Sequence, residues 1–271
     1  MISVLSDMMS YTFIVRAMIV GGLVALCSAL LGVSLVLKRY SMIGDGLSHV
    51  AFAALTIAVA MNVAPLYIST PIVTVAAIIL LRLSENSKIK GDSAIALIST
   101  VSIAIGVVVT ALTKGMNTDV YSYMFGSILA MSESDVYMSI ALSVVVIILF
   151  VFFYNKIFAV TFDESFAKAT GTKADAYNMI IAVLTAITIV VGMRIMGTML
   201  ISSLIIFPAL ISMRNFKTFK SVIICSAIVS VVCFFLGIVL SYLYSIPTGA
   251  SIVLVNTVAL ILSYLIRELR N

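Results

Sequence analysis

The segment Lys38-Arg-Tyr-Ser-Met-Ile-Gly-Asp-Gly-Leu-Ser-His49 decides how the chain is organised, because it places polar residues between two long apolar runs. His49 is the only histidine of the sequence, Asp45 stands four residues before it, and the apolar run 50–61 follows. In a helix that starts near Tyr40, these two side chains lie on one face with their Cβ atoms roughly 6 Å apart. The spacing predicts that they act together.

The expected depth of this pair makes it a candidate site. At about 1.5 Å per residue, His49 lies roughly 13 Å from the basic end of the helix, close to the centre of a hydrocarbon layer about 30 Å thick. An ionisable side chain at that depth costs on the order of 3 kcal/mol and therefore needs a functional reason. Carboxylate and imidazole are suitable ligands for a divalent metal such as zinc, so we predict that Asp45 and His49 bind a metal ion.

Two questions about the pair stay open at this point. Asp45 could instead cap a helix that begins at Gly46, which would leave His49 in the first turn near the headgroups. This interpretation explains Asp45 well and His49 poorly. Two ligands are also too few for a metal that requires four or more, and a twofold dimer would bring two aspartates and two histidines together on its axis.

The composition predicts an all-α polytopic transmembrane bundle. Of the 271 residues, 63% are hydrophobic and 10% are charged, which lies outside the range of soluble domains. The formal net charge is +5, but the basic residues cluster in short loops, where they determine topology rather than bind nucleic acid. Their distribution places the N-terminus outside and the C-terminus in the cytoplasm.

The alternation of apolar runs and polar loops predicts about nine spans, or eight if one run crosses only halfway. The short run 123–132 is too short to cross and is expected to enter from outside as a re-entrant half-helix packed against protein. The second span holds Asp45 and His49 and leaves the membrane near 62–65. Arg194 is expected to separate the sixth span from the seventh. The other spans are expected at 12–37, 66–81, 93–113, 136–154, 178–192, 195–213, 222–244 and 248–266.

Several kinds of activity are disfavoured by missing motifs. The sequence has no Gly-x-x-x-x-Gly-Lys-[Ser/Thr] phosphate loop, no Gly-x-Ser-x-Gly and no His-Glu-x-x-His. We therefore expect a transport subunit rather than an enzyme. Beyond Asp45, the predicted span interiors lack the carboxylates that a proton-coupled transporter strings across the bilayer.

Four fragments, in the same order, resemble the permease subunits of the zinc and manganese ATP-binding-cassette importers, the metal ABC-3 type permease family. The resemblance extends over nearly the whole chain. The fragments are Leu37-Lys-Arg-Tyr-Ser-Met-Ile-Gly-Asp-Gly-Leu-Ser-His49, Phe125-Gly-Ser-Ile-Leu-Ala130, Asp163-Glu-Ser-Phe-Ala-Lys-Ala-Thr-Gly171 and Met196-Gly-Thr-Met-Leu-Ile-Ser-Ser-Leu-Ile-Ile-Phe-Pro-Ala209.

The resemblance implies a single permease domain over residues 1–271 that translocates a divalent transition-metal ion across the cytoplasmic membrane. It implies a homodimer that works with two cytoplasmic ATPase subunits and an extracytoplasmic metal-binding protein. No cofactor is expected to be bound permanently, and Zn²⁺ or Mn²⁺ is expected as the transported substrate. The family's metal-contacting residues correspond to Asp45 and His49.

The resemblance also implies that the cytoplasmic loop at about 161–175 docks on the ATPase. We expect a short helix that ends at a glycine C-cap. The alternative is a solvated amphipathic loop without a partner. The residues expected to couple to the ATPase are Asp163, Glu164, Lys168, Ala169 and Gly171.

Zinc is favoured over manganese by departures from the manganese pattern. Many manganese-type members have Pro-Gly where this chain has Ala53-Ala54, and position 127 is serine rather than an acidic residue. Two other kinds of function are carried as alternatives. One is a stand-alone metal channel or facilitator that is not coupled to an ATPase, and the other is a structural or signalling membrane protein in which Asp45 is only a helix cap.

Overall fold

The computed structural model describes residues 9–86, 91–113 and 133–270. Within them all regular structure is helical, and nine helices are long and apolar enough to cross a membrane. This confirms the predicted all-α bundle with nine spans, while the predicted re-entrant run 123–132 lies outside the described residues. The helices are α2 (Thr12–Leu37), α3 (Ile43–Ala60), α4 (Pro65–Asn86), α5 (Gly91–Leu112), α7 (Glu133–Phe152), α8 (Tyr154–Phe162), α9 (Glu164–Ala169), α10 (Ala174–Met196), α11 (Thr198–Asn215), α12 (Phe219–Tyr244) and α13 (Thr248–Arg270).

The predicted span boundaries hold within a few residues, with one correction between the sixth and seventh spans. Arg194 was expected to separate them, but α10 continues through it to Met196, and Gly197 alone separates α10 from α11. Gly197 has a φ of 79°, which glycine adopts without a steric penalty. The chain therefore changes direction within one residue.

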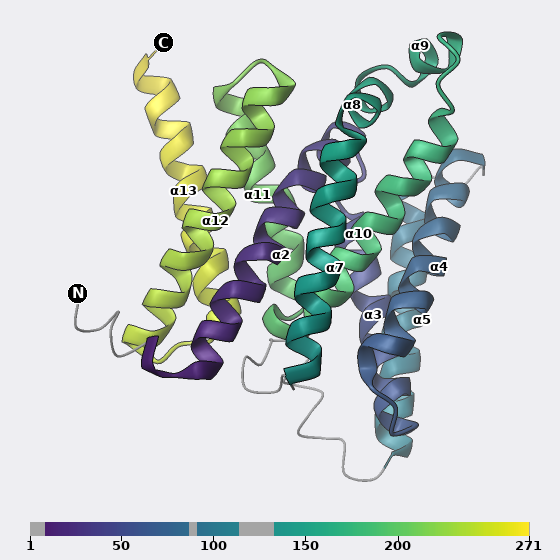
Figure 1. Cartoon of the computed structure of the whole chain (residues 1–271), viewed down its shortest axis with the longest axis vertical. Helices are drawn as coiled ribbons and strands as arrows, with labels where there is room; N and C mark the ends of the chain where they lie inside the picture. Colours follow the sequence, from purple (N-terminus) through teal and green to yellow (C-terminus); the bar gives the residue numbers. More distant parts are fainter. Residues whose placement is uncertain (1–8, 87–90, 114–132, 271) are drawn as a thin grey trace.

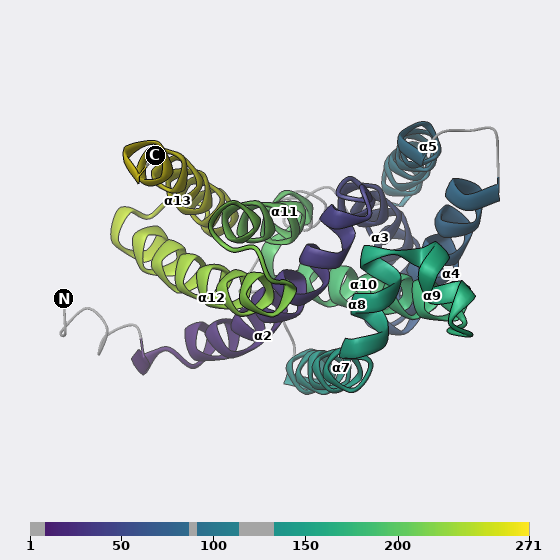
Figure 2. The same ribbon diagram turned by 90° about the horizontal axis from the view of Figure 1, so that it is seen from above.

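The helices run side by side along the long axis of the molecule (Figure 1). The α2–α3 joint, α8, α9, the α11–α12 turn and the C-terminal end of α13 gather at one end, and the start of α2 lies at the other. Seen from above, α11, α12 and α13 form one side and α4 and α5 the other, with α2, α3 and α10 between them (Figure 2). Helix α3 packs against α4, α5, α10 and α11 and is therefore held on several sides.

The central helix α2 approaches its neighbours closely through small residues and hydrogen bonds. The Ser230 hydroxyl of α12 donates to the carbonyl oxygen of Ala25 at 2.8 Å, and the Ser226 hydroxyl donates to that of Ala29 at 3.3 Å. A Cβ atom added to Gly32 would overlap the backbone carbonyl of Ile205 on α11. Small residues and interhelical hydrogen bonds of this kind are typical of helix packing in membranes.

Gly32→Ala should reduce the folded amount and the melting temperature of the detergent-purified protein, because a methyl group cannot fit between α2 and the backbone of α11. The matched control is Gly22→Ala on the same helix, where the nearest atom, on Phe235, would lie 3.5 Å from the new Cβ atom. The control should melt close to the parent. Equal melting temperatures for the two variants would contradict the close α2–α11 contact.

Candidate metal site and helix α9

The structure brings the two predicted ligands together on one face of α3. His49 Nε2 lies 3.6 Å from Asp45 Oδ2, and the two residues are separated by one helical turn. The Asp45 side chain is 43% exposed and that of His49 is 20% exposed, so both can reach a further group outside the chain. The predicted proximity of Asp45 and His49 on one helix face is confirmed.

The interpretation of Asp45 as a helix cap is wrong. The N-cap residue of α3 is Met42, no side chain caps it, and the helix begins at Ile43 rather than at Gly46 or near Tyr40. Asp45 is already inside the first turn, and its carboxylate faces His49 instead of the backbone N–H groups.

The start of α3 lies level with the middle of another membrane-spanning helix. A Cβ atom added to Gly44 would come within 3.0 Å of the Ile205 side chain and 3.9 Å of Ser202, which lie in the middle part of α11. His49 follows Gly44 by about 7 Å along the helix axis. The pair therefore lies inside the thickness of the bundle, as its position in the sequence predicted.

In the part of the chain that the structure describes, no third potential metal ligand accompanies Asp45 and His49. Among residues 9–86, 91–113 and 133–270, no group of three or more His, Cys, Asp or Glu side chains could hold a metal ion. Asp45 and His49 thus supply one carboxylate and one imidazole, and a tetrahedral zinc ion would need further donors.

The short helix predicted within the loop 161–175 is present as α9. Asp163 is its N-cap and accepts a hydrogen bond from the backbone N–H of Phe166 at 2.9 Å. Gly171 has a φ of 81°, and the bonds from Gly171 N to Lys168 O and from Thr172 N to Ala167 O form the paired C-terminal closure of a helix end. Both ends of α9 are therefore fixed by its own sequence.

Glu164 and Lys168, which were expected to face an ATPase, form ion pairs with residues of their own chain. Lys168 Nζ lies 3.0 Å from Glu164 Oε1 and 2.9 Å from Asp175 Oδ1. Partial burial of Glu164 opposes its ionisation, but hydrogen bonds from Asn178, Lys168 and Lys38 outweigh that effect and lower its pKa to about 2. The hydrogen bond to Asp175, followed by that to Glu164, raises the pKa of Lys168.

Two further residues of this network were missed at the sequence level. Lys38, the C-cap of α2, donates to Asn178 Oδ1 at 2.6 Å and to Glu164 Oε2 at 3.1 Å, and Asn178 Nδ2 donates to Glu164 Oε2 at 3.1 Å. The Lys38 side chain is only 10% exposed. Its partners lie 126 and 140 residues further along the chain, so the only sequence signal was a basic residue at the end of a span.

Aromatic side chains cover the outer surface beside α9. Phe162 is 62% exposed and Phe166 is 65% exposed. Phe158 packs on Phe162 with a centroid distance of 5.2 Å and on Phe219 of α12 at 5.0 Å. Exposed aromatic side chains such as Phe162 and Phe166 are typical of a surface that contacts another protein or a membrane.

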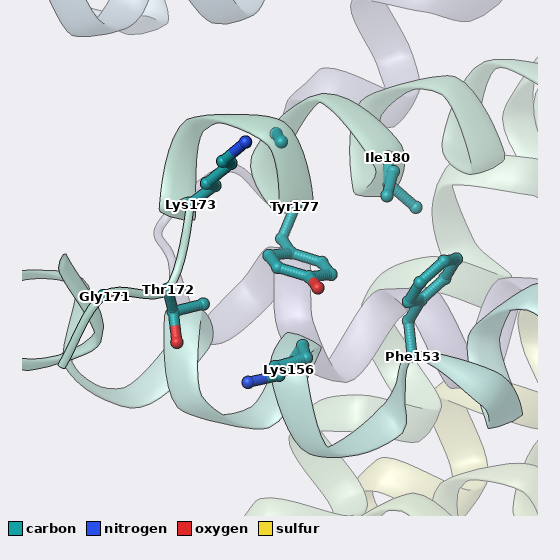
Figure 3. Close-up of a pocket in the computed structure, with 8 residues that line it drawn as sticks. Phe153, Lys156, Gly171, Thr172, Lys173, Tyr177 and Ile180 are labelled. Carbon is teal, nitrogen blue, oxygen red and sulfur yellow. The ribbon is translucent and has the colours of Figure 1, made fainter.

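A cavity of about 280 Å³ lies next to the turn between α9 and α10. In Figure 3 the amino groups of Lys156 and Lys173 point in different directions, so they do not converge on one anion. The cavity is lined by Phe153, Lys156, Gly171, Thr172, Lys173, Ala176, Tyr177 and Ile180.

The fold defines an integral membrane protein with an Asp45–His49 pair inside its bundle and a short helix, α9, at one end. The model of the ABC 3 transport family matches residues 10–267, and the chain belongs to this family.

Relatives of this chain are named for metal transport. It is 29% identical to the high-affinity zinc uptake system membrane protein ZnuB of Haemophilus influenzae, over 93% of this chain and 97% of that protein. It is 26% identical to the manganese transport system membrane protein MntC of Halalkalibacterium halodurans, over 95% and 88%. Among solved structures, it is similar to a chain of PsaBC from Streptococcus pneumoniae in complex with Fab, with a TM-score of 0.87 and 26% identity over 97% and 95%.

Replacing the N-cap of α9 should loosen this helix without affecting the bundle. Asp163→Ala removes the acceptor for the Phe166 N–H and should destabilise α9 by on the order of 1 kcal/mol, whereas Asp163→Asn keeps an acceptor and should be nearly neutral. Hydrogen exchange of the α9 amides measures the effect. Faster exchange in both variants would show that charge rather than capping is what α9 requires.

Proposed function

We propose that this chain is the transmembrane permease subunit of an ATP-binding-cassette importer for a divalent transition-metal ion, with zinc as the first candidate and manganese as the second. The observation that carries the proposal is the Asp45–His49 pair on α3, inside the bundle of a chain that belongs to the ABC 3 transport family. Residues 1–271 act as one permease domain, and separate subunits hydrolyse ATP.

The incomplete ligand set supports a homodimer. A twofold axis beside α3 would add a second carboxylate and a second imidazole to the first pair, giving the four donors that zinc prefers. The exposed parts of Asp45 and His49 leave both residues accessible to such a partner.

The distribution of basic side chains supports the orientation. One end of the molecule carries α8, α9 and the α11–α12 turn (Figure 1). This end also carries four lysines: Lys38, Lys156, Lys173 and Lys217. Since cytoplasmic loops are enriched in lysine and arginine, this end faces the cytoplasm. The C-terminus is then cytoplasmic and the N-terminus lies outside.

Transport proceeds by alternating access. An extracytoplasmic binding protein delivers the ion to the outer side, and the carboxylates offset its charge while neutral imidazoles coordinate it. Closure of the two ATPases moves α9 and opens the path to the cytoplasm. Each chain contributes only two of the four ligands, so the ion is released to the cytoplasm when the two pairs no longer coordinate it together.

The ATPase contacts the exposed side of α9, which carries Phe166 and Ala169. The other predicted coupling residues act indirectly: Asp163 caps the helix, Glu164 and Lys168 bind it to the bundle, and Gly171 ends it.

Substitution of either metal ligand should abolish import while the protein stays in the membrane. Asp45→Ala and His49→Ala each remove half of the donors of one chain, and Asp45→Asn should be nearly as harmful because the negative charge is lost. Ser48→Ala is the matched control, since the Ser48 hydroxyl donates only to the Gly44 carbonyl of its own helix. Uptake of radioactive zinc and manganese into cells measures both activity and selectivity.

If His49→Ala takes up zinc and manganese at the rate of the parent protein, the ligand assignment is refuted. A preference for manganese in the parent, with the same loss in both variants, would reverse the order of the two metals and leave the site unchanged.

Phe166→Ser should weaken ATPase binding, because it removes a 65% exposed aromatic side chain from the docking face. Phe152→Ser on α7 is the matched control: Phe152 is 77% exposed, but it belongs to a predicted membrane span. Co-purification of the ATPase with each variant measures the effect. Equal recovery of the ATPase with both variants would exclude Phe166 from the interface.

The alternative of a stand-alone metal channel is tested with the permease alone in liposomes. A channel passes zinc without any other subunit, whereas the permease should pass none until its ATPase, ATP and the loaded binding protein are present.

A further inference from the structure

Lys38, Glu164 and Asn178 form a closed network in which each side chain contacts the other two. They come from three helices: Lys38 ends α2, Glu164 begins α9, and Asn178 lies near the start of α10. The network therefore joins α9 to the helix that leads directly into the metal-bearing helix α3.

Two of the three side chains in this network are largely removed from water. The Lys38 side chain is 10% exposed and Asn178 is 3% exposed, while Glu164, at 35%, reaches the surface. Charged hydrogen bonds in such surroundings are stronger and more directional than those at an exposed surface. We therefore expect Lys38 to move with Glu164 when Glu164 is displaced.

The joint between Lys38 and α3 is short and stiff. Arg39 N donates to Val36 O, Tyr40 N donates to Leu35 O, and Ile43 N donates back to Tyr40 O. Arg39 has a φ of 63°, a left-handed conformation that costs a non-glycine residue about 1 kcal/mol or more. A joint held in this way by hydrogen bonds transmits motion into the first turn of α3.

We propose that Lys38 is a positioning residue that couples the movement of α9 to the position of Asp45 and His49. The proposal rests on the proposed function, since it requires α9 to be moved by an ATPase. When α9 moves, Glu164 and Asn178 carry Lys38 with them, and the α2–α3 joint shifts the first turn of α3.

A purely structural role explains the network less well. Helix α9 is closed at both ends by its own Asp163 cap and Gly171 turn, so it does not need Lys38 in order to be helical. Buried ion pairs also add little net stability compared with apolar residues of similar volume. What the pair adds is a charged link between two helices that are far apart in the sequence.

The test uses the complete importer, with both permease copies, the ATPases and the zinc-loaded binding protein, in proteoliposomes. The parent is compared with Lys38→Met, which keeps the length of the side chain but not its charge. Lys38→Arg keeps the positive charge and can still donate to both Glu164 and Asn178. Lys217→Met is the matched control, an exposed lysine at the same end that forms no ion pair with any described residue.

Two quantities are measured. The first is the number of ATP molecules hydrolysed per zinc ion imported, and the second is the amount of assembled complex. Lys38→Met should retain hydrolysis and raise this ratio by roughly two- to thirtyfold, the range expected for mutations that alter coupling between sites. Lys38→Arg should keep the ratio close to that of the parent, and Lys217→Met should not change it. A structural role predicts less complex with an unchanged ratio.

An unchanged ratio in Lys38→Met would overturn the proposal, and so would a ratio raised as far in Lys38→Arg as in Lys38→Met. If Lys38→Met does not assemble, Lys38→Gln is measured in its place, and an unchanged ratio in that variant likewise overturns the proposal. A parent complex without ATP-dependent zinc or manganese import would instead refute the proposed function, so the two failures are distinguishable.

Discussion

The contact of Ile205 with two glycines fixes the depth of the candidate metal site. The backbone of α2 reaches the Ile205 carbonyl at Gly32, and the Ile205 side chain packs on Gly44 in the first turn of α3. One residue of α11 therefore sets the level of both helices that flank the joint. Because neither glycine has a side chain, α2 meets the backbone of α11 and α3 meets the Ile205 side chain, and Asp45, the residue after Gly44, is held at that level.

This packing leaves the α2–α3 joint little freedom to absorb motion. Helix α3 is held by α4, α5, α10 and α11, and the residues between Leu37 and Ile43 are occupied by hydrogen bonds of their own. In the proposed mechanism, a movement of the α2 end shifts the first turn of α3 against α11, where the predicted ligands lie. The tight packing that positions Asp45 and His49 would then link them to the end of the molecule that carries α9.

Features set by local sequence could be predicted, and those set by distant contacts could not. The Asp45–His49 pair follows from helical periodicity, and the end of α9 follows from Gly171, because both depend on neighbours within one or two turns. The break at Gly197 was misplaced because the apolar character continues across it. The bond between Lys38 and Glu164 was not foreseeable, since it requires knowing which helix ends meet.

The charge state of the Lys38–Glu164–Asn178 network determines whether it can respond to pH. The pKa of Glu164 is lowered to about 2 from an ordinary value of 4.5, so its stabilising contribution is complete above that ordinary value and is lost only as the pH falls toward 2. Within the pH range of a cell the carboxylate stays ionised and Lys38 keeps its partner. The contact between α9 and α2 therefore does not sense pH within that range, which agrees with the positioning role proposed for Lys38.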